Sequence, residues 1–380
     1  MRRLTRQRSR WTWLGALVAM LALALGGCAV PGTIASAQRL RPVPPAPTAT
    51  PLPPVRFPLD EAPHHDLTEW WYYTGHLHGT DAAGQARTYG FELVVFQNLR
   101  GTFPPYYAAH FAITDLARGQ FHYDQRVQFG GAGNLPAAPT TSGFNLAVGG
   151  WGMQGVGGQD HLTATLADYA ADLRLTGTKP AVLHGGSGLI TYGLAGFSYY
   201  YSRPRMAVSG TLVDHGAAIA VSGTAWMDHQ WGNFVSLAGA GWDWYSIQLD
   251  NNTEYMLYII RDQQKRPLSV VGTYVAADGR ASEVSAAAIA IQPQGQWTSP
   301  VTHGVYPAGW QVTLSDQHLS LTLAPALADQ ELVTAASTGV AYWEGTVRVS
   351  GTLAGRPISG QGYVELTGYA SVPSAAPTLP

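Results

Sequence analysis

Short segments of alternating apolar and polar residues, separated by glycine-rich breaks, run through most of this chain. In the first half, the apolar residues nowhere keep a period of 3.6 for three turns, as an amphipathic helix requires. The 380 residues include 44 glycines and 25 prolines, and aromatic residues reach 11%. Such a composition suits many strands and turns better than long helices. We therefore predict an all-β protein made of antiparallel strands.

The second half of the chain repeats the pattern of the first. A hairpin led by aromatic residues is predicted at 69–97 and again at 242–261. The closing hairpins also correspond, because Val-Ser-Gly-Thr-Leu occurs at 208–212 and at 349–353. These matches predict a tandem duplication of one antiparallel barrel.

The alignment of the two halves suggests different roles for two neighbouring residues, Asp228 and His229. It makes Asp228 equivalent to Glu365, whereas His229 is equivalent to Leu366. An acid that is kept in both copies favours a structural role. The histidine, which is present in one copy only, is the better functional candidate.

The first 28 residues have the layout of a bacterial lipoprotein signal. A basic segment at 2–10 precedes an apolar run at 11–25, which is shorter than a comfortable membrane span. The run ends in Leu25-Gly26-Gly27-Cys28, which resembles the bacterial lipobox, and Cys28 is the only cysteine. We expect lipidation of Cys28 and a membrane-anchored protein outside the cytoplasm, at the cell surface or in the periplasm. A plain secretory signal with a chance cysteine, or an uncleaved anchor, is the alternative.

Charge and motifs exclude several classes of protein. Outside the signal, the chain carries 17 basic and 24 acidic residues without basic clusters, which argues against nucleic acid as a partner. The sequence has no nucleophile elbow, no Walker loop and no dinucleotide fingerprint. A single cysteine allows no internal disulfide. We expect no cofactor and no metal.

An acid and a histidine stand side by side among tryptophans in the segment 221–261. A carboxyl group in an apolar site can stay protonated near neutrality, and an imidazole can orient a water or take its proton. Indole faces stabilise a carbocation. Asp228 as proton donor, His229 as base, and Trp231 with Trp242 or Trp244 as cation-stabilising walls would suit the hydration of an alkene.

Structural explanations of these residues stay open. Asp228 and His229 are adjacent, so in a regular strand their side chains point to opposite faces and cannot line one pocket. Glu69, which precedes two tryptophans, is explained best as an acid that closes a barrel end by hydrogen bonding. His76 and His78 share a strand face as zinc ligands would, but a polar outer face explains them better.

Several motifs together resemble the AttH and carotenoid 1,2-hydratase (hydroxyneurosporene synthase) family of lipocalin-like proteins. The resemblance covers nearly all of 57–369 and implies two tandem lipocalin-like (calycin-type) antiparallel β-barrels. It also implies an apolar ligand, such as a polyene or another isoprenoid, and hydration of a carbon–carbon double bond. The motifs are Glu69–Leu77, Met227–Gly232, Gly241–Tyr245, Tyr342–Gly345 and Val364–Tyr369.

The resemblance also implies site residues. The hydratase members are held to use a His-x-Trp element with a tyrosine and an aspartate downstream. His229 and Trp231 match the element, and Tyr255, Tyr258 and Asp262 are the nearest downstream residues. The resulting candidates for catalysis are Asp228, His229, Trp231 and Tyr258; those for ligand binding are Trp226, Trp242, Trp244, Tyr245, Glu69 and Trp70.

The sequence thus predicts five segments and three possible functions. We expect a lipoprotein that binds an elongated apolar ligand and hydrates or isomerises a double bond. The alternatives are a non-catalytic carrier of lipids or pigments and a structural envelope protein. The segments are a signal peptide (1–28), a proline-rich tether (29–56), an N-terminal barrel (57–235), a C-terminal barrel (236–372) and a disordered tail (373–380).

Overall fold

The computed structural model describes residues 52–101, 103–130, 143–192, 196–234 and 241–372. From Pro53 onward the chain forms one compact unit. The predicted signal with Cys28, most of the tether and the tail lie outside the described residues. No helix within these ranges is long and apolar enough to span a membrane.

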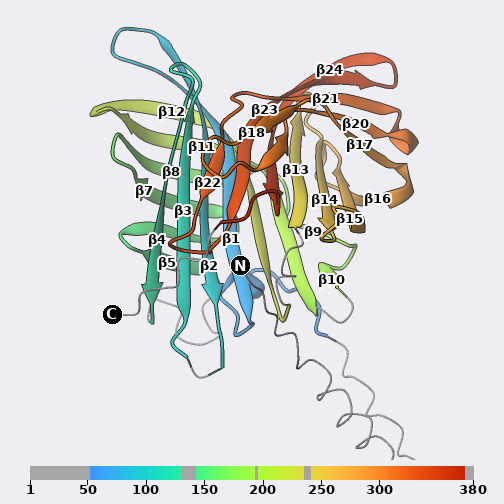
Figure 1. Cartoon of the computed structure of the whole chain (residues 1–380), viewed down its shortest axis with the longest axis horizontal. Coiled ribbons are helices and arrows are strands. Elements are labelled where there is room, and N and C mark those ends of the chain that lie inside the picture. Colours follow the sequence, from blue (N-terminus) through green and yellow to red (C-terminus); the bar gives the residue numbers. More distant parts are fainter. Residues whose placement is uncertain (1–51, 102, 131–142, 193–195, 235–240, 373–380) are drawn as a thin grey trace, which may run out of the picture. The chain divides into compact units, whose positions relative to one another are not determined.

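The first half of the body is a twelve-stranded antiparallel sheet that curls into a nearly closed barrel (Figure 1). Its strands follow the order β4-β3-β2-β1-β12-β11-β8-β7-β6-β5, and β9 and β10 both pair with β11. The short helix η1 (Leu59–Glu61) precedes it. The strands are β1 (Thr68–Thr80), β2 (Ala86–Asn98), β3 (Tyr106–Asp115), β4 (Gln120–Phe129), β5 (Phe144–Val148), β6 (Trp151–Val156), β7 (Gln159–Thr165), β8 (Tyr169–Gly177), β9 (Val182–Leu183), β10 (Leu189–Thr191), β11 (Phe197–Asp214) and β12 (Ala217–Gly232).

The second half is a ten-stranded antiparallel sheet, with a separate two-stranded sheet made of β18 and β19. Its main order is β16-β15-β14-β13-β24-β23-β21-β20-β17, and β22 pairs with β23. The short helices are η3 (Ala286–Ala288) and η4 (Ser315–Gln317). The strands are β13 (Gly241–Leu249), β14 (Glu254–Arg261), β15 (Pro267–Val275), β16 (Ala281–Val284), β17 (Ile289–Pro293), β18 (Gln296–Thr298), β19 (Val305–Pro307), β20 (Trp310–Leu314), β21 (Leu319–Pro325), β22 (Glu331–Val333), β23 (Ala341–Leu353) and β24 (Arg356–Thr367).

The two sheets share one topology, in agreement with the predicted duplication. In each, the first strand pairs with the second strand on one side and with the last strand on the other. Asp228 lies opposite Tyr72 of β1, and Glu365 lies opposite Trp244 of β13 at the corresponding register. The predicted all-β fold with two tandem barrels is confirmed.

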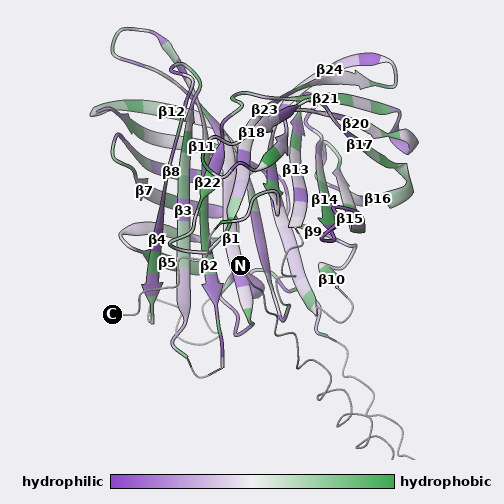
Figure 2. Ribbon diagram, in the orientation of Figure 1, coloured by the Kyte–Doolittle hydropathy of each residue, from purple (hydrophilic) through white to green (hydrophobic). Residues whose placement is uncertain are grey.

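Alternating side chains build a separate core inside each barrel. Along β8, for example, buried and more exposed residues alternate, and the ribbon colours alternate in the same way along several strands (Figure 2). Because successive side chains of a strand point to opposite faces, one face of each strand fills a barrel with apolar groups. Trp71, Tyr107 and Trp151 are buried in the first barrel, and Trp310 and Trp343 in the second.

Three strands have features that matter for the site or the barrel. The glycine-rich stretch 149–158 contains β6. Strand β11 has a register shift between Arg203 and Met206. Strand β12 continues to Gly232, so Asp228 and His229 lie within a paired strand.

The outer faces of the two barrels also pack against each other. Tyr72, Tyr200 and Trp226 of the first sheet join Trp244 and Tyr258 of the second in one buried cluster. Residues on the outside of one barrel are therefore in the interior of the protein. The candidate site lies in this interface.

Candidate active site

A cleft with room for about 50 Å³ opens between the outer faces of the two barrels. Strands β1, β2, β11 and β12 form one wall, and β13, β14, β23 and β24 form the other. Carboxyl groups of Glu92, Asp228 and Glu365 line the cleft between aromatic rings. The aromatic lining residues are Trp70, Tyr72, Phe96, Tyr200, Trp242, Trp244, Tyr258 and Tyr342.

Asp228 accepts hydrogen bonds on both of its carboxyl oxygens. Tyr200 Oη donates to Oδ2 at 2.6 Å, Trp226 Nε1 donates to Oδ1 at 2.6 Å, and Ser202 Oγ donates to Oδ1. Trp244 Nε1, from the second barrel, donates to Tyr200 Oη at 2.9 Å. A chain of donors from both barrels therefore holds Asp228 in place.

Glu92 and Glu365 are less completely bonded. Tyr342 Oη donates to Glu92 Oε1 at 2.9 Å, and Trp242 Nε1 donates to Glu365 Oε2 at 2.8 Å. The other oxygen of Glu92 is buried and has no hydrogen-bond partner among the described residues. Glu92 therefore has one carboxyl oxygen whose hydrogen-bonding capacity is not used by the described residues.

A fourth carboxyl group, Glu344, is buried beside the cleft. Tyr72 Oη donates to its Oε1 at 2.7 Å, and its Oε2 has no partner among the described residues. Burial and the neighbouring Glu92 and Glu365 raise the pKa of Glu344 well above its ordinary value. The buried surroundings of Glu344 therefore favour its protonated form.

The three carboxyl groups that line the cleft also hold their protons unusually tightly. Burial raises the pKa of Glu92 to about 8, that of Asp228 to about 7 and that of Glu365 to about 7. Hydrogen bonds to each group offset only part of this desolvation, and no positively charged side chain contributes. The cleft therefore offers both protonated and ionised carboxyl groups near neutral pH.

This arrangement suits acid–base chemistry on a neutral, apolar molecule. A general acid or base works best when its pKa lies near the operating pH, as it does for these groups. Tryptophan and tyrosine rings stabilise a positive charge that develops between them, by about 1–2 kcal/mol each when water is excluded. The cleft combines both features.

His229 does not share this site, although it follows Asp228 directly. It points into the N-terminal barrel, where its side chain is fully buried, and its Nε2 lies 2.8 Å from Glu69 Oε1. Its ring stacks on Trp71 with the centroids 4.6 Å apart. The prediction that Asp228 and His229 line one pocket is therefore wrong, because successive residues of a regular strand face opposite sides.

Glu69 and Trp231 also lie on the barrel side. Glu69 accepts hydrogen bonds from the backbone of His64 and from Gln97 Nε2, besides contacting both histidine rings. Burial would raise the pKa of Glu69, but the hydrogen bonds from His229 and His64 lower it. Hydrogen bonding by Glu69 at the barrel end agrees with its predicted closing role, and its proposed contact with a ligand in the cleft does not hold.

The three side chains that converge at this barrel end are the one group of described residues with metal-ligand geometry. One atom each of His64, Glu69 and His229 lies within 4.8 Å of the others. Burial would lower the pKa of His64, but its contacts with Asp60 and Glu69 raise it to about 9. Burial lowers the pKa of His229 to about 4.

Most of the other predicted site residues lie at the cleft. Trp70, Trp242, Trp244 and Tyr258 line it, and Trp226 is buried beside it and bonded to Asp228. Their roles in binding or catalysis remain predictions.

Four further candidates are elsewhere. Tyr245 belongs to the core of the second barrel, so it does not reach the cleft as predicted. Tyr255 belongs to the same core, and Asp262 pairs with Arg266 in a turn. His76, predicted on a polar outer face, is buried against Tyr363 because that face is covered by the other barrel.

Sequence reasoning missed Glu92, Tyr200 and Tyr342 as site residues. Glu92 carried a usable signal, because it is the one charged residue in the run Tyr89–Phe96. An acid in such a run is buried and needs an explanation. The tyrosines carried no such signal, since many tyrosines in the chain fill barrel cores.

A larger surface depression, of about 310 Å³, lies near Phe121, Tyr123 and Val301. Its buried acid, Glu331, accepts hydrogen bonds from three neighbouring hydroxyl groups, including that of Tyr306 at 2.8 Å. The exposed acid Asp329 also lines it. The smaller cleft gathers three carboxyl groups between aromatic rings, so it is the better candidate.

Comparisons with known proteins identify the same architecture. Residues 48–369 match the family model described as AttH-like. A crystal structure from Nitrosomonas europaea, described as an AttH protein, is 31% identical; the match covers 84% of this chain and 99% of that one, with a TM-score of 0.73. Kievitone hydratase from Nectria haematococca is 20% identical over 84% of this chain and 94% of its own, with a TM-score of 0.66. No curated protein matches the chain in sequence.

Proposed function

Because this chain belongs to the AttH-like family, we propose that it uses the cleft between its two barrels to add water across a carbon–carbon double bond of an apolar, isoprenoid-like ligand. One observation carries the proposal: Glu92, Asp228 and Glu365 line an aromatic-walled cleft with their pKa values raised to between about 7 and about 8. The likeness in fold to kievitone hydratase supports the same class of reaction.

In this proposal Glu92 is the proton donor. Its free oxygen delivers a proton to one alkene carbon, and a carbocation develops on the other carbon between the indole rings of Trp242 and Trp244. A water oxygen then bonds to the cation, and Asp228 takes the proton that the water loses. Protons exchange back from Asp228 to Glu92 through solvent, so the net reaction consumes one water molecule.

The room in the cleft limits the ligand. A space of about 50 Å³ holds the end of a molecule rather than a whole isoprenoid. The double bond that reacts is therefore near an end of the ligand, and the rest extends out of the cleft. A branched terminal alkene, which gives a tertiary cation, suits this geometry best.

We also propose that the protein is a lipoprotein, held on a membrane outside the cytoplasm through lipid on Cys28. The apolar ligand would then be met at the membrane surface. Mass analysis of the mature N-terminus tests this part separately. Lipid on Cys28 is the expected result, and an unmodified or uncleaved Cys28 would refute it.

The test of the reaction uses the purified full chain and an acyclic isoprenoid with a branched terminal alkene, in water labelled with ¹⁸O. We expect a product heavier by one labelled water, formed by the wild type and lost in Glu92→Gln. The exposed acid Glu283 supplies the control variant, Glu283→Gln, which should retain activity. Ligand that co-purifies without turnover would instead support the carrier, and neither binding nor turnover would leave the envelope role.

A further inference from the structure

We propose a second site, independent of the cleft: His64, Glu69 and His229 at the end of the N-terminal barrel bind one divalent transition-metal ion, with zinc as the best fit. His64 Nδ1 and His229 Nε2 each lie 2.8 Å from the same oxygen, Glu69 Oε1. Two imidazoles and one carboxylate are a donor set typical of zinc.

The three ligands come from different parts of the chain. His64 precedes the first strand, Glu69 is in β1, and His229 is in the last strand of the same barrel, β12. β1 and β12 pair directly, with Trp71 opposite His229, so two of the ligands are fixed by the sheet itself. Only His64 depends on a connecting segment.

The positions of the rings are further fixed by stacking. His64 stacks on Trp231 with an interplanar angle of 2° and centroids 4.2 Å apart, and His229 stacks on Trp71. Such contacts remove rotational freedom before a metal arrives. A preorganised site loses less entropy on binding.

Each ligand also has an outer partner, as metal-bound side chains usually have. His64 Nε2 lies 3.7 Å from Asp60 Oδ1, and His229 Nδ1 lies 3.3 Å from Tyr201 Oη. The second oxygen of Glu69 accepts from Gln97 Nε2 at 3.0 Å. The three atoms that face one another, His64 Nδ1, His229 Nε2 and Glu69 Oε1, are therefore left to bind an ion.

Metal binding requires the ligand atoms to move. Zinc–nitrogen and zinc–oxygen bonds of about 2.0–2.2 Å place tetrahedral ligands about 3.4 Å apart. The two nitrogen–oxygen separations of 2.8 Å must therefore widen by about 0.6 Å, and the two nitrogens, which lie up to 4.8 Å apart, must approach by up to about 1.4 Å. The side chain of His64 is 19% exposed, which gives a water molecule access as the fourth ligand.

Without a metal, the same residues form a hydrogen-bonded cluster. The experiment must therefore distinguish a metal site from such a cluster. The purified full chain is stripped with a chelator and titrated with Zn²⁺ alone, and bound metal is counted by mass spectrometry. Co²⁺ replaces Zn²⁺ in a parallel titration, because its visible absorption reports tetrahedral nitrogen and oxygen ligands. We expect one metal per chain.

The control variant is supplied by the neighbouring residue. His65 is exposed and is not part of the cluster, so His65→Ala should bind metal as the wild type does. His64→Ala should weaken binding by about 100-fold, since loss of an outer partner alone costs about 10–100-fold. His64 is on a connecting segment outside the strands, and circular dichroism checks that the variant is folded.

Tyr201→Phe gives a second test that leaves all three ligands in place. Loss of the Tyr201 hydroxyl, which contacts His229 Nδ1, should weaken Zn²⁺ binding by about 10-fold. Wild-type protein that binds no Zn²⁺, or binding that His64→Ala leaves unchanged, would overturn the proposal. Loss of alkene hydration in these variants is not required, so the failure of one proposal does not decide the other.

Discussion

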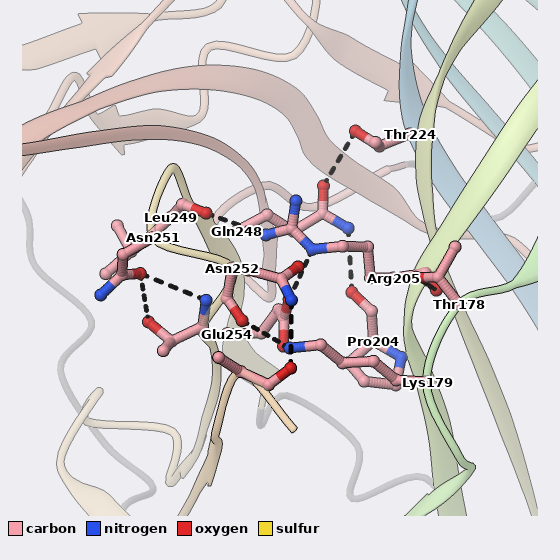
Figure 3. Close-up of polar contacts among 12 residues, drawn as sticks. Thr178, Lys179, Pro204, Arg205, Thr224, Gln248, Leu249, Asn251, Asn252 and Glu254 are labelled. Atoms are coloured by element: carbon pink, nitrogen blue, oxygen red, sulfur yellow. Dashed lines mark hydrogen bonds and ion pairs between the residues drawn. The ribbon is translucent and has the colours of Figure 1, made fainter. Parts of the chain in front are cut away.

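The interface between the barrels buries carboxyl groups in two opposite ways. At the cleft, Glu92 and Glu365 have no positively charged partner that affects their pKa values. Elsewhere in the same interface, the fully buried Glu254 contacts two cations, Lys179 at 2.7 Å and Arg205 at 2.5 Å (Figure 3). Positive charge is thus available between the barrels and is kept away from the cleft.

This second region works as a polar lock between the barrels. Lys179 and Arg205 belong to the first half of the chain, and Glu254 belongs to β14 of the second. Lys179 Nζ also donates to the backbone oxygens of Asn252 and Ala276, at 2.6 and 2.9 Å (Figure 3 shows the surrounding contacts). A buried charge with full partners holds two surfaces in register, whereas a buried acid without them is tuned for proton transfer.

The largest effect that we expect is a loss of turnover when the cleft, rather than the polar lock, is changed. Glu92→Gln removes the proposed proton donor and should lower turnover by about 10²–10⁴-fold, the usual contribution of a general acid. At about pH 4.5 the free energy of unfolding of the variant should be close to that of the wild type, because the amide keeps the shape of the protonated acid and needs no charge. Steady-state rates and denaturant unfolding of the same preparation measure both. Full activity in Glu92→Gln would show that Glu92 is not the proton donor, and the cleft would then have no demonstrated catalytic role that the lock lacks.

The second prediction applies the same change to the lock. Glu254→Gln leaves Lys179 and Arg205 without their carboxylate, and breaking a buried ion pair costs about 3–5 kcal/mol. We expect that loss in the free energy of unfolding, measured by urea titration. A variant as stable as the wild type would show that the lock contributes nothing to the fold.

The sequence predicted the barrels and five of the thirteen residues that line the cleft, but it did not predict the division between cleft and lock. Asp228 and Trp242 were predicted because an acid and a histidine stand among tryptophans in the segment 221–261. Whether an outward-facing residue meets solvent or another barrel depends on the contact between the two halves, which no local pattern encodes. Glu92, Tyr342 and His76 are buried where the two halves meet: Tyr342 bonds to Glu92, and His76 packs against Tyr363.

The third prediction concerns pH. The folded-state pKa of Glu92 is raised to about 8 from an ordinary value of 4.5. The protonated group therefore supports the fold fully below about pH 4.5, and this contribution is lost as the pH rises through about 8. Turnover should fall about tenfold per pH unit above pH 8, as the proton donor ionises.

Two measurements check the sign of this effect. The wild type should be less stable at pH 8.5 than at pH 5, and Glu92→Gln should lose less stability over the same interval. His64, whose raised pKa of about 9 acts in the same direction, is present in both proteins and cancels in the difference. Turnover that rises steadily between pH 8 and pH 10 would be incompatible with Glu92 as an acid.

The smallest effect that we expect refines the cleft itself. Trp242→Phe keeps an aromatic ring but removes the indole N–H that donates to Glu365 at 2.8 Å. One hydrogen bond contributes about 1 kcal/mol, so turnover should change by less than about tenfold. Half-buried Trp297 lies in the separate two-stranded sheet and does not line the cleft, so Trp297→Phe should leave turnover unchanged. A loss as large as that of Glu92→Gln would make Glu365, rather than Glu92, the key acid.

The shared topology of the two sheets also bears on the symmetry of the cleft. Asp228 and Glu365 hold the same register in their barrels and line the same cleft from opposite walls. Two identical barrels that met through these strands would present the same acid from each side. In this chain one wall carries an aspartate and the other a glutamate, so the cleft has unequal sides.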